Sequence, residues 1–334
     1  MPDVERVLIA DHVEHACVEG LSSLGCEVVL RPELEAESIA RAVSKIEPVV
    51  LVVRSAKVPV EAFGASDDLK MVIRAGSGFD NISLQAASDR GIAVCNCPGM
   101  NADAVAELTL GHLIALDRRI PEQGAALARG EWRQGEFGDA RGLKGRAILV
   151  IGVGSTGVEV LRRAQAFGMD VWAQSRSLTE DVARALGVRW IPFGRDALLE
   201  NLARFDAVTL HVPITTETRG MCDAVFFEAM RPGAMFINTS RGEIVDERAL
   251  LDAVRAGHVR AAVDVYRDQP ASKHASWSTP LAGVDGLHTT HHVGASTQQA
   301  QLAVAREIVR MVRVYRDSGV FEHCVNNVRG PGLN

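Results

Sequence analysis

The sequence predicts an α/β protein with two domains, each built on a doubly wound parallel sheet. Its 334 residues exceed the roughly 250–300 at which a single hydrophobic core stops growing. Short β-branched runs alternate with amphipathic stretches, which is typical of parallel strands covered by helices. This alternation occurs twice, on either side of a polar, glycine-rich segment at residues 130–145. We therefore expect one sheet before that segment and one after it.

The first series of strands precedes a long helix. The predicted strands are Val7–Ala10, Val28–Leu30, Val49–Val53, Met71–Arg74 and Ile92–Val94. The helix begins near Asn101 or Asp103, either of which can cap it, and runs to about Leu116. This helix would connect the two domains.

The second series follows the glycine-rich segment. Its predicted strands are Ala147–Ile151, Val171–Ala173, Ala207–Leu210, Met235–Ile237 and Ala261–Val265. A final helix, roughly Ser296–Arg316, closes the sequence. It could return to the first domain and make that domain discontinuous, which the pattern alone leaves open.

Composition argues against several classes of function. The net charge of −6 disfavours a nucleic-acid surface, and no apolar run is long enough for a membrane span. The first residues lack the cationic, apolar pattern of a secretion signal. Six cysteines are scattered without a disulfide framework, and Cys95 and Cys97 are too close along one extended segment to pair. We expect buried, reduced cysteines and a cytoplasmic protein that binds neither nucleic acid nor membrane.

The clearest motif is a glycine-rich loop between a strand and a helix. Ala147–Ile151 runs directly into Gly152, Gly154, Ser155, Thr156 and Gly157, and an apolar-striped helix follows. Glycines let the backbone approach a pyrophosphate, and the helix N-terminus offers it free N–H groups and a positive dipole end. This context predicts a dinucleotide site; the alternative is merely a tight turn.

The end of the next strand bears on the choice of cofactor. NAD sites commonly carry an acidic residue there, about 20 residues after the motif, whereas this chain has Ser175 and Arg176. A hydroxyl and a guanidinium suit the 2′-phosphate of NADP. We expect NADP(H) or NAD(H), with NADP(H) favoured. Alternatively, Arg176 is an ordinary exposed charge and both cofactors bind.

Chemically competent residues follow three later strands. They lie in the segments 239–242, 264–270 and 290–294, at the strand ends where open α/β sheets bind ligands. Together with other motifs in the same order, they resemble the D-isomer-specific 2-hydroxyacid dehydrogenase family over nearly the whole chain. The matching segments are 74–81, 101–108, 152–157, His211-Val212-Pro213, Ser240-Arg241-Gly242 and 292–297.

The resemblance implies an architecture. Residues 1–98 and 295–334 would form a discontinuous substrate-binding domain flanking a dinucleotide-binding domain at 99–294, both Rossmann-like, with the active site in the cleft. A homodimer through residues 101–129 is implied as well. The motifs are most similar to the phosphoglycerate dehydrogenase branch, which serves serine biosynthesis, in a short form without a regulatory domain.

The resemblance also implies catalytic roles. Arg241 would bind the substrate carboxylate and polarise the 2-carbonyl, which suits a planar cation. His292 would donate a proton to the carbonyl oxygen, or remove it in the oxidative direction. Alternatively, Arg241 only forms an ion pair within its loop, and His292 is a buried structural histidine. His288 and His291 lie near His292 in sequence, but no carboxylate or thiolate at that spacing supports zinc, so we expect no metal.

One position departs from the family pattern. Where the family has a Glu that pairs with the histidine, this chain has Gln269, before Pro270. An amide orients imidazole but adds no negative charge, so the pKa of the imidazolium should lie lower. We expect a slower enzyme, a shifted pH optimum, or a cofactor-binding regulatory protein without turnover. Asp268 could substitute if the loop is displaced.

The remaining site residues follow from the resemblance. Cofactor contacts are expected from His211, Val212, Pro213, Thr239, Ser240, Asp264 and Gly294. Substrate contacts are expected from Arg54, Arg74, Ser77, Gly78 and Asn101. Arg54, Arg74 and Lys57 are three cations that would suit a phosphate, although they could be ordinary surface charges. The substrate would be a small 2-hydroxy or 2-keto acid, 3-phosphoglycerate first, with hydroxypyruvate or glyoxylate as the alternative.

Overall fold

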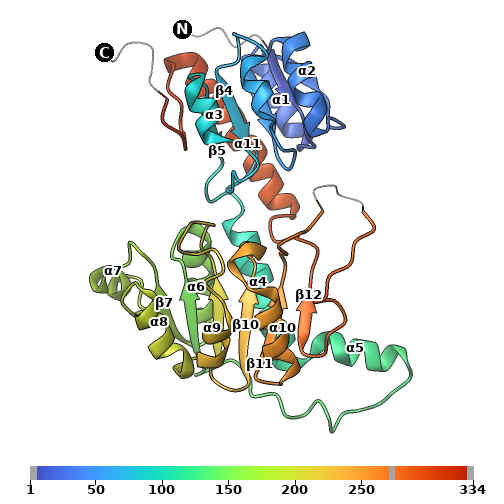
Figure 1. Cartoon of the computed structure of the whole chain (residues 1–334), viewed down its shortest axis with the longest axis vertical. Helices are drawn as coiled ribbons and strands as arrows, with labels where there is room; N and C mark the ends of the chain where they lie inside the picture. The colour runs from blue at the N-terminus through green and yellow to red at the C-terminus, as the bar shows by residue number, and fades with distance from the viewer. Residues whose placement is uncertain (1–5, 271–274, 329–334) are drawn as a thin grey trace. The chain divides into compact units, whose positions relative to one another are not determined.

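The computed structural model describes residues 6–270 and 275–328, and the chain divides into two compact units. Unit 1 takes in Met1–Asn101 and Ser296–Asn334, and unit 2 takes in Ala102–Ala295. Figure 1 shows the last helix, α11 (Gln298–Ser318), alongside the strands of unit 1. Unit 1 is therefore discontinuous in sequence.

Unit 1 is built on a parallel sheet with the strand order β2-β1-β3-β4-β5. Its strands are β1 (Arg6–Ile9), β2 (Glu27–Leu30), β3 (Val50–Val53), β4 (Met71–Arg74) and β5 (Ala93–Asn96). Its helices are α1 (His15–Ser23), α2 (Ala36–Ile46), the 3₁₀ helix η1 (Val60–Gly64), α3 (Leu84–Asp89) and α11.

The strands of unit 1 bury both faces because alternate side chains point to opposite sides of a sheet. Ile9 and Val52 face a core completed by α1 and α11, whereas Leu8 and Val53 face a core completed by α2, η1 and α3. Gly20 lets α1 approach α11 closely, since a Cβ there would lie 2.6 Å from Cγ2 of Val309. This packing holds the last helix in unit 1.

Unit 2 is built on a larger parallel sheet with the order β12-β11-β10-β9-β6-β7-β8. Its strands are β6 (Ala147–Ile151), β7 (Asp170–Gln174), β8 (Arg189–Trp190), β9 (Ala207–Leu210), β10 (Ala234–Asn238), β11 (Val259–Val263) and β12 (Leu287–Thr289). Its helices are α4 (Ala102–Arg118), α5 (Ile120–Ala128), α6 (Ser155–Ala166), α7 (Glu180–Ala185), α8 (Arg195–Asn201), α9 (Ala224–Ala229) and α10 (Glu247–Arg255), with 3₁₀ helices η2 (Leu202–Arg204) and η3 (Gly242–Ile244).

The order of strands in unit 2 creates a switch point beside β6. From β6 the chain proceeds to β7 and β8 on one side, and then returns to β9 on the other. Loops leave in opposite directions there, which opens a crevice at the carboxyl ends of the strands. Residues 152–157 and 211–213 follow the two strands at this point.

The two faces of the unit 2 sheet carry separate cores. Helices α4 and α6 cover one face, and α8, α9 and α10 cover the other. On the second face Phe226, Phe227 and Phe236 meet edge to face, with ring centroids 5.1–6.0 Å apart. Such a buried aromatic cluster fixes how α9 lies on β10.

These findings confirm the predicted fold class and add elements that the sequence pattern did not reveal. Strand β8 consists of only two residues, too short for any periodicity, and α5 begins after a break at Arg119, whose φ is 53°. No helix of the described residues is long and apolar enough to cross a lipid bilayer.

The amino-terminal edge of the unit 2 sheet is held by a buried carboxylate. Asp206, directly before β9, accepts hydrogen bonds from Arg141 (2.9 Å), Arg231 (3.1 Å) and the N–H of Ala147 (3.1 Å). Burial opposes its ionisation, but the Ala147 N–H and the charge of Arg146 lower its pKa overall. The stabilisation is therefore present at neutral pH and is lost as acid protonates the carboxyl.

We predict that Asp206→Ala lowers the free energy of unfolding by about 3 kcal/mol at pH 7, because it takes one ion-pair partner from the buried Arg146 and removes the carboxylate acceptor of the Ala147 N–H. Asp181→Ala is the control, since Asp181 pairs with Arg184 on the surface of α7 with 89% of its side chain exposed, and such pairs contribute about 0–1 kcal/mol. Urea denaturation measures both. Equal losses for the two variants would contradict this assignment.

Candidate active site

The glycine-rich loop after β6 is packed against the end of β9. Gly152 has a φ of 98°, and a Cβ there would lie 2.4 Å from the carbonyl oxygen of His211 and 2.8 Å from Cγ1 of Val212. A Cβ on Gly157 would lie 2.0 Å from the Gly152 carbonyl oxygen. Both positions accept only glycine, because β6, α6 and β9 meet there.

The first turn of α6 has no side-chain cap. Its N-cap is Gly154, and the helix begins at Ser155 and Thr156. A Cβ built on Gly154 would meet nothing within 4 Å, so the loop is open at this glycine. Helix N–H groups beside open space form a site for a phosphate or pyrophosphate, which fits a dinucleotide.

The end of β7 carries an arginine held by two other loops. Arg176 lies 3.3 Å from Oε1 of Glu217, which follows β9, and its guanidinium carbon lies 5.7 Å from the ring centre of Phe193, which follows β8. The hydroxyl of Thr215 donates to the other oxygen of Glu217 at 2.8 Å. Sequence reasoning singled out Ser175 and Arg176 but missed Glu217, since this carboxylate comes from a distant strand end.

The environment of His211, which follows β9, favours the neutral imidazole. Burial lowers its pKa to about 3, its Nε2 contacts the hydroxyl of Thr209 at 3.0 Å, and its Nδ1 is buried without a hydrogen-bond partner among the described atoms. The neighbouring Pro213 carbonyl accepts from Thr218 at 2.7 Å. The loop after β9 is thus fixed by its own polar contacts.

Asn238, the buried last residue of β10, shapes the loop that carries Arg241. Its Oδ1 accepts from the N–H (3.0 Å) and hydroxyl (2.8 Å) of Ser240, and its Nδ2 donates to the carbonyl of Arg241 (2.9 Å). The Arg241 side chain, half-buried, donates back to the Ser240 carbonyl at 2.7 Å. Thr239 instead contacts the hydroxyl of Thr109 on α4 at 3.1 Å.

Gly242 brings the loops after β10 and β11 together. A Cβ there would lie 2.1 Å from the carbonyl carbon of Tyr266 and 2.3 Å from the amide nitrogen of Arg267. Only glycine allows this approach, so the segment that contains Gln269 is held directly against the residue that follows Arg241.

Asp264 fixes the loop after β12. Its carboxylate, 1% exposed, accepts from the hydroxyl of Thr290 (2.6 Å) and the N–H groups of Val293 (2.9 Å) and Gly294 (2.8 Å). These bonds enclose His292, whose φ of 52° is unfavourable for a side chain with a Cβ. The carboxylate therefore stabilises a strained backbone that keeps His292 exposed.

Gln269 and His292 are in direct contact. Nε2 of Gln269 lies 2.5 Å from Nδ1 of His292, and Oε1 of Gln269 accepts from the N–H of Tyr266 at 3.2 Å. The neighbouring Asp268 is exposed, and it is Gln269 that contacts the imidazole.

This contact determines where the imidazole carries its proton. An amide nitrogen donates and does not accept, so with the amide in this orientation Nδ1 accepts and the ring proton lies on Nε2. An imidazolium has a proton on Nδ1 as well, which needs an acceptor. Protonating His292 therefore requires the Gln269 amide to rotate and lose the bond from Tyr266.

The other histidines near His292 in sequence lie in different surroundings. Nε2 of His288 lies 3.1 Å from Oε2 of Glu122 on α5, and His291 is exposed. Within residues 6–270 and 275–328, no group of three or more His, Cys, Asp or Glu side chains could hold a metal ion.

In unit 1, Asp11 shapes the loop after β3. One carboxylate oxygen accepts from the N–H groups of Arg54 (3.1 Å), Ser55 (2.6 Å) and Ala56 (3.0 Å). The Arg54 guanidinium donates to Gln301 at 3.4 Å. Because Arg74 pairs with Val53 in the sheet, Arg54 and Arg74 lie at neighbouring strand ends.

The loop after β4 passes close to the Arg74 side chain. Gly76 has a φ of 148°, and a Cβ there would lie 1.9 Å from a guanidinium nitrogen of Arg74. Asn96 donates to the Ser77 carbonyl at 2.6 Å, and the Ser77 hydroxyl donates to Asn101 at 2.7 Å. Gly78 follows in the same loop.

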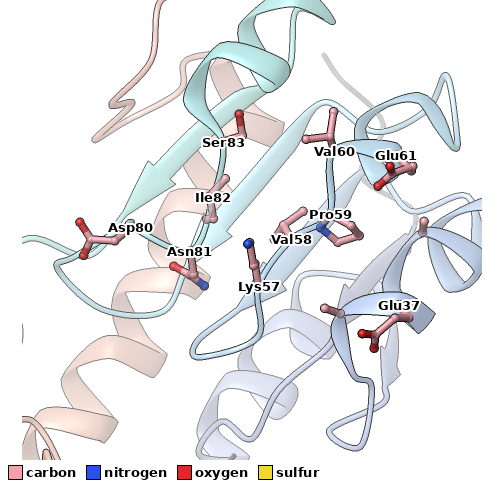
Figure 2. Close-up of a pocket in the computed structure, with 12 residues that line it drawn as sticks. Glu37, Lys57, Val58, Pro59, Val60, Glu61, Asp80, Asn81, Ile82 and Ser83 are labelled. Carbon is pink, nitrogen blue, oxygen red and sulfur yellow. The ribbon is translucent and has the colours of Figure 1, made fainter. Parts of the chain in front are cut away.

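Lys57 lines a hollow in unit 1. The hollow has a volume of about 670 Å³ and is also lined by Glu37, Glu61 and Asn81, and neither Arg54 nor Arg74 is among the lining residues. Figure 2 shows the Lys57 side chain beside Val58 and Asn81.

Comparisons with known proteins agree with this geometry. Residues 110–294 match the family model described as "D-isomer specific 2-hydroxyacid dehydrogenase, NAD binding domain". The D-3-phosphoglycerate dehydrogenase of Archaeoglobus fulgidus is 38% identical over 314 residues, which cover 92% of this chain and 57% of that protein. The chain thus spans a little over half the length of this relative.

Solved structures show the same fold. A glyoxylate reductase from Paecilomyes thermophila matches with a TM-score of 0.84 and 25% identity, covering 97% of this chain and 99% of that one. An NADPH-dependent glyoxylate/hydroxypyruvate reductase from Sinorhizobium meliloti, solved with NADP and malonate, matches with a TM-score of 0.81 and 25% identity, covering 97% of each chain. The matched family model covers more than half of the chain, and the chain belongs to the D-isomer-specific 2-hydroxyacid dehydrogenase family.

Proposed function

We propose that the chain is an NAD(P)-dependent D-2-hydroxyacid dehydrogenase. One observation carries the proposal: Gly152–Gly157, Arg241, Gln269 and His292 all follow carboxyl ends of strands in a single parallel sheet. That edge is where such sheets bind ligands and perform chemistry. A bound nicotinamide would supply or accept the hydride at C2 of the acid.

Side chains at this edge of the sheet bind the substrate and transfer the proton. Arg241 binds the carboxylate of the acid with its planar guanidinium and polarises the 2-carbonyl oxygen. During reduction the imidazolium form of His292, which requires the rotated Gln269 amide, donates its Nε2 proton to that oxygen, and during oxidation the neutral ring accepts the proton at Nε2. Gln269 orients the imidazole, and Asp264 and Gly294 maintain the loop that presents it.

Binding of the dinucleotide is assigned to the crevice beside β6. The open Gly154 and the uncapped first turn of α6, with Ser155 and Thr156, receive the pyrophosphate. Residues 211–213 and 239–240 line the neighbouring strand ends.

We further propose that NADP(H) is favoured over NAD(H). Ser175 and Arg176 replace the acidic residue that NAD sites commonly carry, and the structurally similar reductase from Sinorhizobium meliloti was solved with NADP. The 2′-phosphate competes with Glu217 for Arg176. That exposed ion pair is weak, since such pairs contribute about 0–1 kcal/mol, so a phosphate can displace it.

The proposed substrate is 3-phosphoglycerate and its 2-keto acid. The Archaeoglobus fulgidus relative is named for this activity, and Arg54 and Arg74 lie at neighbouring strand ends of unit 1, where they suit a phosphate. Ser77, Gly78 and Asn101 are the proposed carboxylate contacts. Hydroxypyruvate or glyoxylate is the alternative, favoured by the names of the similar reductases.

We also propose that the protein is a cytoplasmic homodimer. On α5 and in the loop that follows it, Ile120, Leu127 and Trp132 are 51%, 58% and 78% exposed. Large apolar side chains gathered on one exposed segment are typical of a protein interface.

A second candidate function is a cofactor-sensing protein without turnover. The observation that favours it is Gln269, because an amide leaves a protonated His292 without a negative partner. Turnover of any 2-keto acid would exclude this candidate, whereas tight NADP(H) binding without turnover would support it.

We predict that the purified protein oxidises NADPH faster than NADH with 3-phosphohydroxypyruvate, and that His292→Asn lowers this rate by about 10²–10⁴-fold. The readout is initial-rate absorbance at 340 nm, with hydroxypyruvate and glyoxylate in parallel. His291→Asn is the control and should retain the rate, because His291 has no proposed role. Equal rates for the wild type and His292→Asn would contradict the mechanism.

We predict that Gln269→Glu extends reductive activity by roughly one pH unit to higher pH. A carboxylate accepts from the Nδ1 proton of His292 without rotating away from Tyr266, so it stabilises the imidazolium that reduction requires. Oxidation needs neutral imidazole and should weaken near pH 7. Gln134→Glu, which adds the same charge in the loop after α5, is the control. An unchanged pH profile in Gln269→Glu would refute this role.

A further inference from the structure

The chain after α11 folds back along an edge of the unit 1 sheet. Gly319, with a φ of 73°, ends the helix. The N–H of Val325 donates to the Val94 carbonyl at 2.8 Å, and the N–H of Asn96 donates to the His323 carbonyl at 3.3 Å. β5 is the edge strand there, so this short segment covers backbone groups that would otherwise be unpaired.

These two hydrogen bonds enclose Cys95 and Cys324. The two residues are directly opposite each other in an antiparallel bridge, and the flanking bonds make them a non-hydrogen-bonded pair, in which Cα atoms lie about 4.5 Å apart with side chains on one face. A disulfide requires roughly 4.4–6.8 Å between Cα atoms. The backbone therefore already has a spacing that a disulfide accepts.

The two thiols differ in access and in proton affinity. Cys95 is fully buried, whereas Cys324 is partly exposed. A hydrogen bond between the two side chains and burial both raise the pKa of Cys95. The same hydrogen bond lowers the pKa of Cys324, although burial opposes this shift. The single S–H of Cys324 can donate to the backbone or to the side-chain oxygen of Asn326, each 3.3 Å from Sγ. Backbone hydrogen bonds of Asn326 and Val94 favour the thiolate.

We propose that Cys95 and Cys324 are an oxidation site at which a hydroperoxide produces a reversible disulfide. The Cys324 thiolate attacks one oxygen of hydrogen peroxide and, with one proton, gives a sulfenic acid and water. The Cys95 thiol then attacks that sulfur, an S–S bond forms, and the hydroxyl leaves as a second water. Two thiols are oxidised by two electrons, and the peroxide is reduced.

The other cysteines of the described chain are less suited to this chemistry. Cys17, Cys26, Cys97 and Cys222 are buried, and burial raises the pKa of each thiol. Thiolate character and access determine which cysteine a peroxide attacks, so Cys324 reacts first and Cys95 is its resolving partner.

A Cys95–Cys324 disulfide would lie close to the loop that contains Ser77, which is proposed to bind substrate. Asn96, next to Cys95, donates to the Ser77 carbonyl, so the new constraint on β5 lies one residue from that contact. The oxidation chemistry is independent of the proposed function, because it needs neither cofactor nor substrate.

The experiment treats the 334-residue chain with about one equivalent of hydrogen peroxide and records the intact mass, after which the remaining thiols are blocked and the linked peptides are mapped. The expected result is a loss of 2 Da, a Cys95–Cys324 cross-link and full reversal by dithiothreitol. Cys324→Ser should abolish the mass loss, and Cys26→Ala, the control, should retain it.

A second variant tests the order of events. In Cys95→Ala, checked for folding by circular dichroism, Cys324 should accumulate as a sulfenic acid that dimedone traps. A cross-link between other cysteines would overturn the proposal, as would a persistent mass loss in Cys324→Ser. The proposal would also be overturned if the thiols of the protein stayed reduced under a peroxide treatment that fully oxidises a reference dithiol.

Discussion

The carboxylate of Asp264 is the interaction on which the arrangement of the candidate site depends. It is buried at the end of β11 and accepts three hydrogen bonds from the loop after β12. Its removal would take away three hydrogen bonds that flank the left-handed backbone of His292. Tyr266 reinforces the connection, since its hydroxyl donates to the Thr290 carbonyl at 2.6 Å. A buried charge thus determines the position of an exposed imidazole.

Gln269 changes what that imidazole can do without changing where it lies. Its amide is held by the Tyr266 N–H and faces Nδ1 of His292. A carboxylate could serve both donors at once, whereas the amide must rotate before the ring is protonated. The replacement of the family's Glu by Gln269 therefore affects proton transfer and leaves the backbone of the loops unchanged. For this reason the fold alone does not reveal the replacement.

Sequence reasoning predicted the fold because local periodicity determines each strand. Ala147–Ile151 and Ala207–Leu210 are strands with the expected bounds, and the polar residues after the strands gather at one edge of each sheet. The short β8 has no periodicity to detect. The return of α11 depends on a fit between Gly20 and Val309, which are far apart in sequence.

The contacts that support the site were harder to predict, because their partners are also brought together only by the fold. Asn238 and Asp11 are polar residues at the ends of apolar strands, a signal that could have been used, but their partners are loop N–H groups that only the fold identifies. Glu217 meets Arg176 across two strand ends. Cys324 meets Cys95 from the opposite end of the chain, where spacing along the sequence is uninformative.

The most direct test of the central claim follows the hydride itself. The protein would reduce a 2-keto acid with NADPH carrying deuterium at both C4 positions of the nicotinamide, and the product would be examined by mass spectrometry and chiral chromatography. The account predicts a D-2-hydroxy acid with deuterium at C2. An L product, or a hydroxy acid without deuterium at C2, would contradict the assigned reaction.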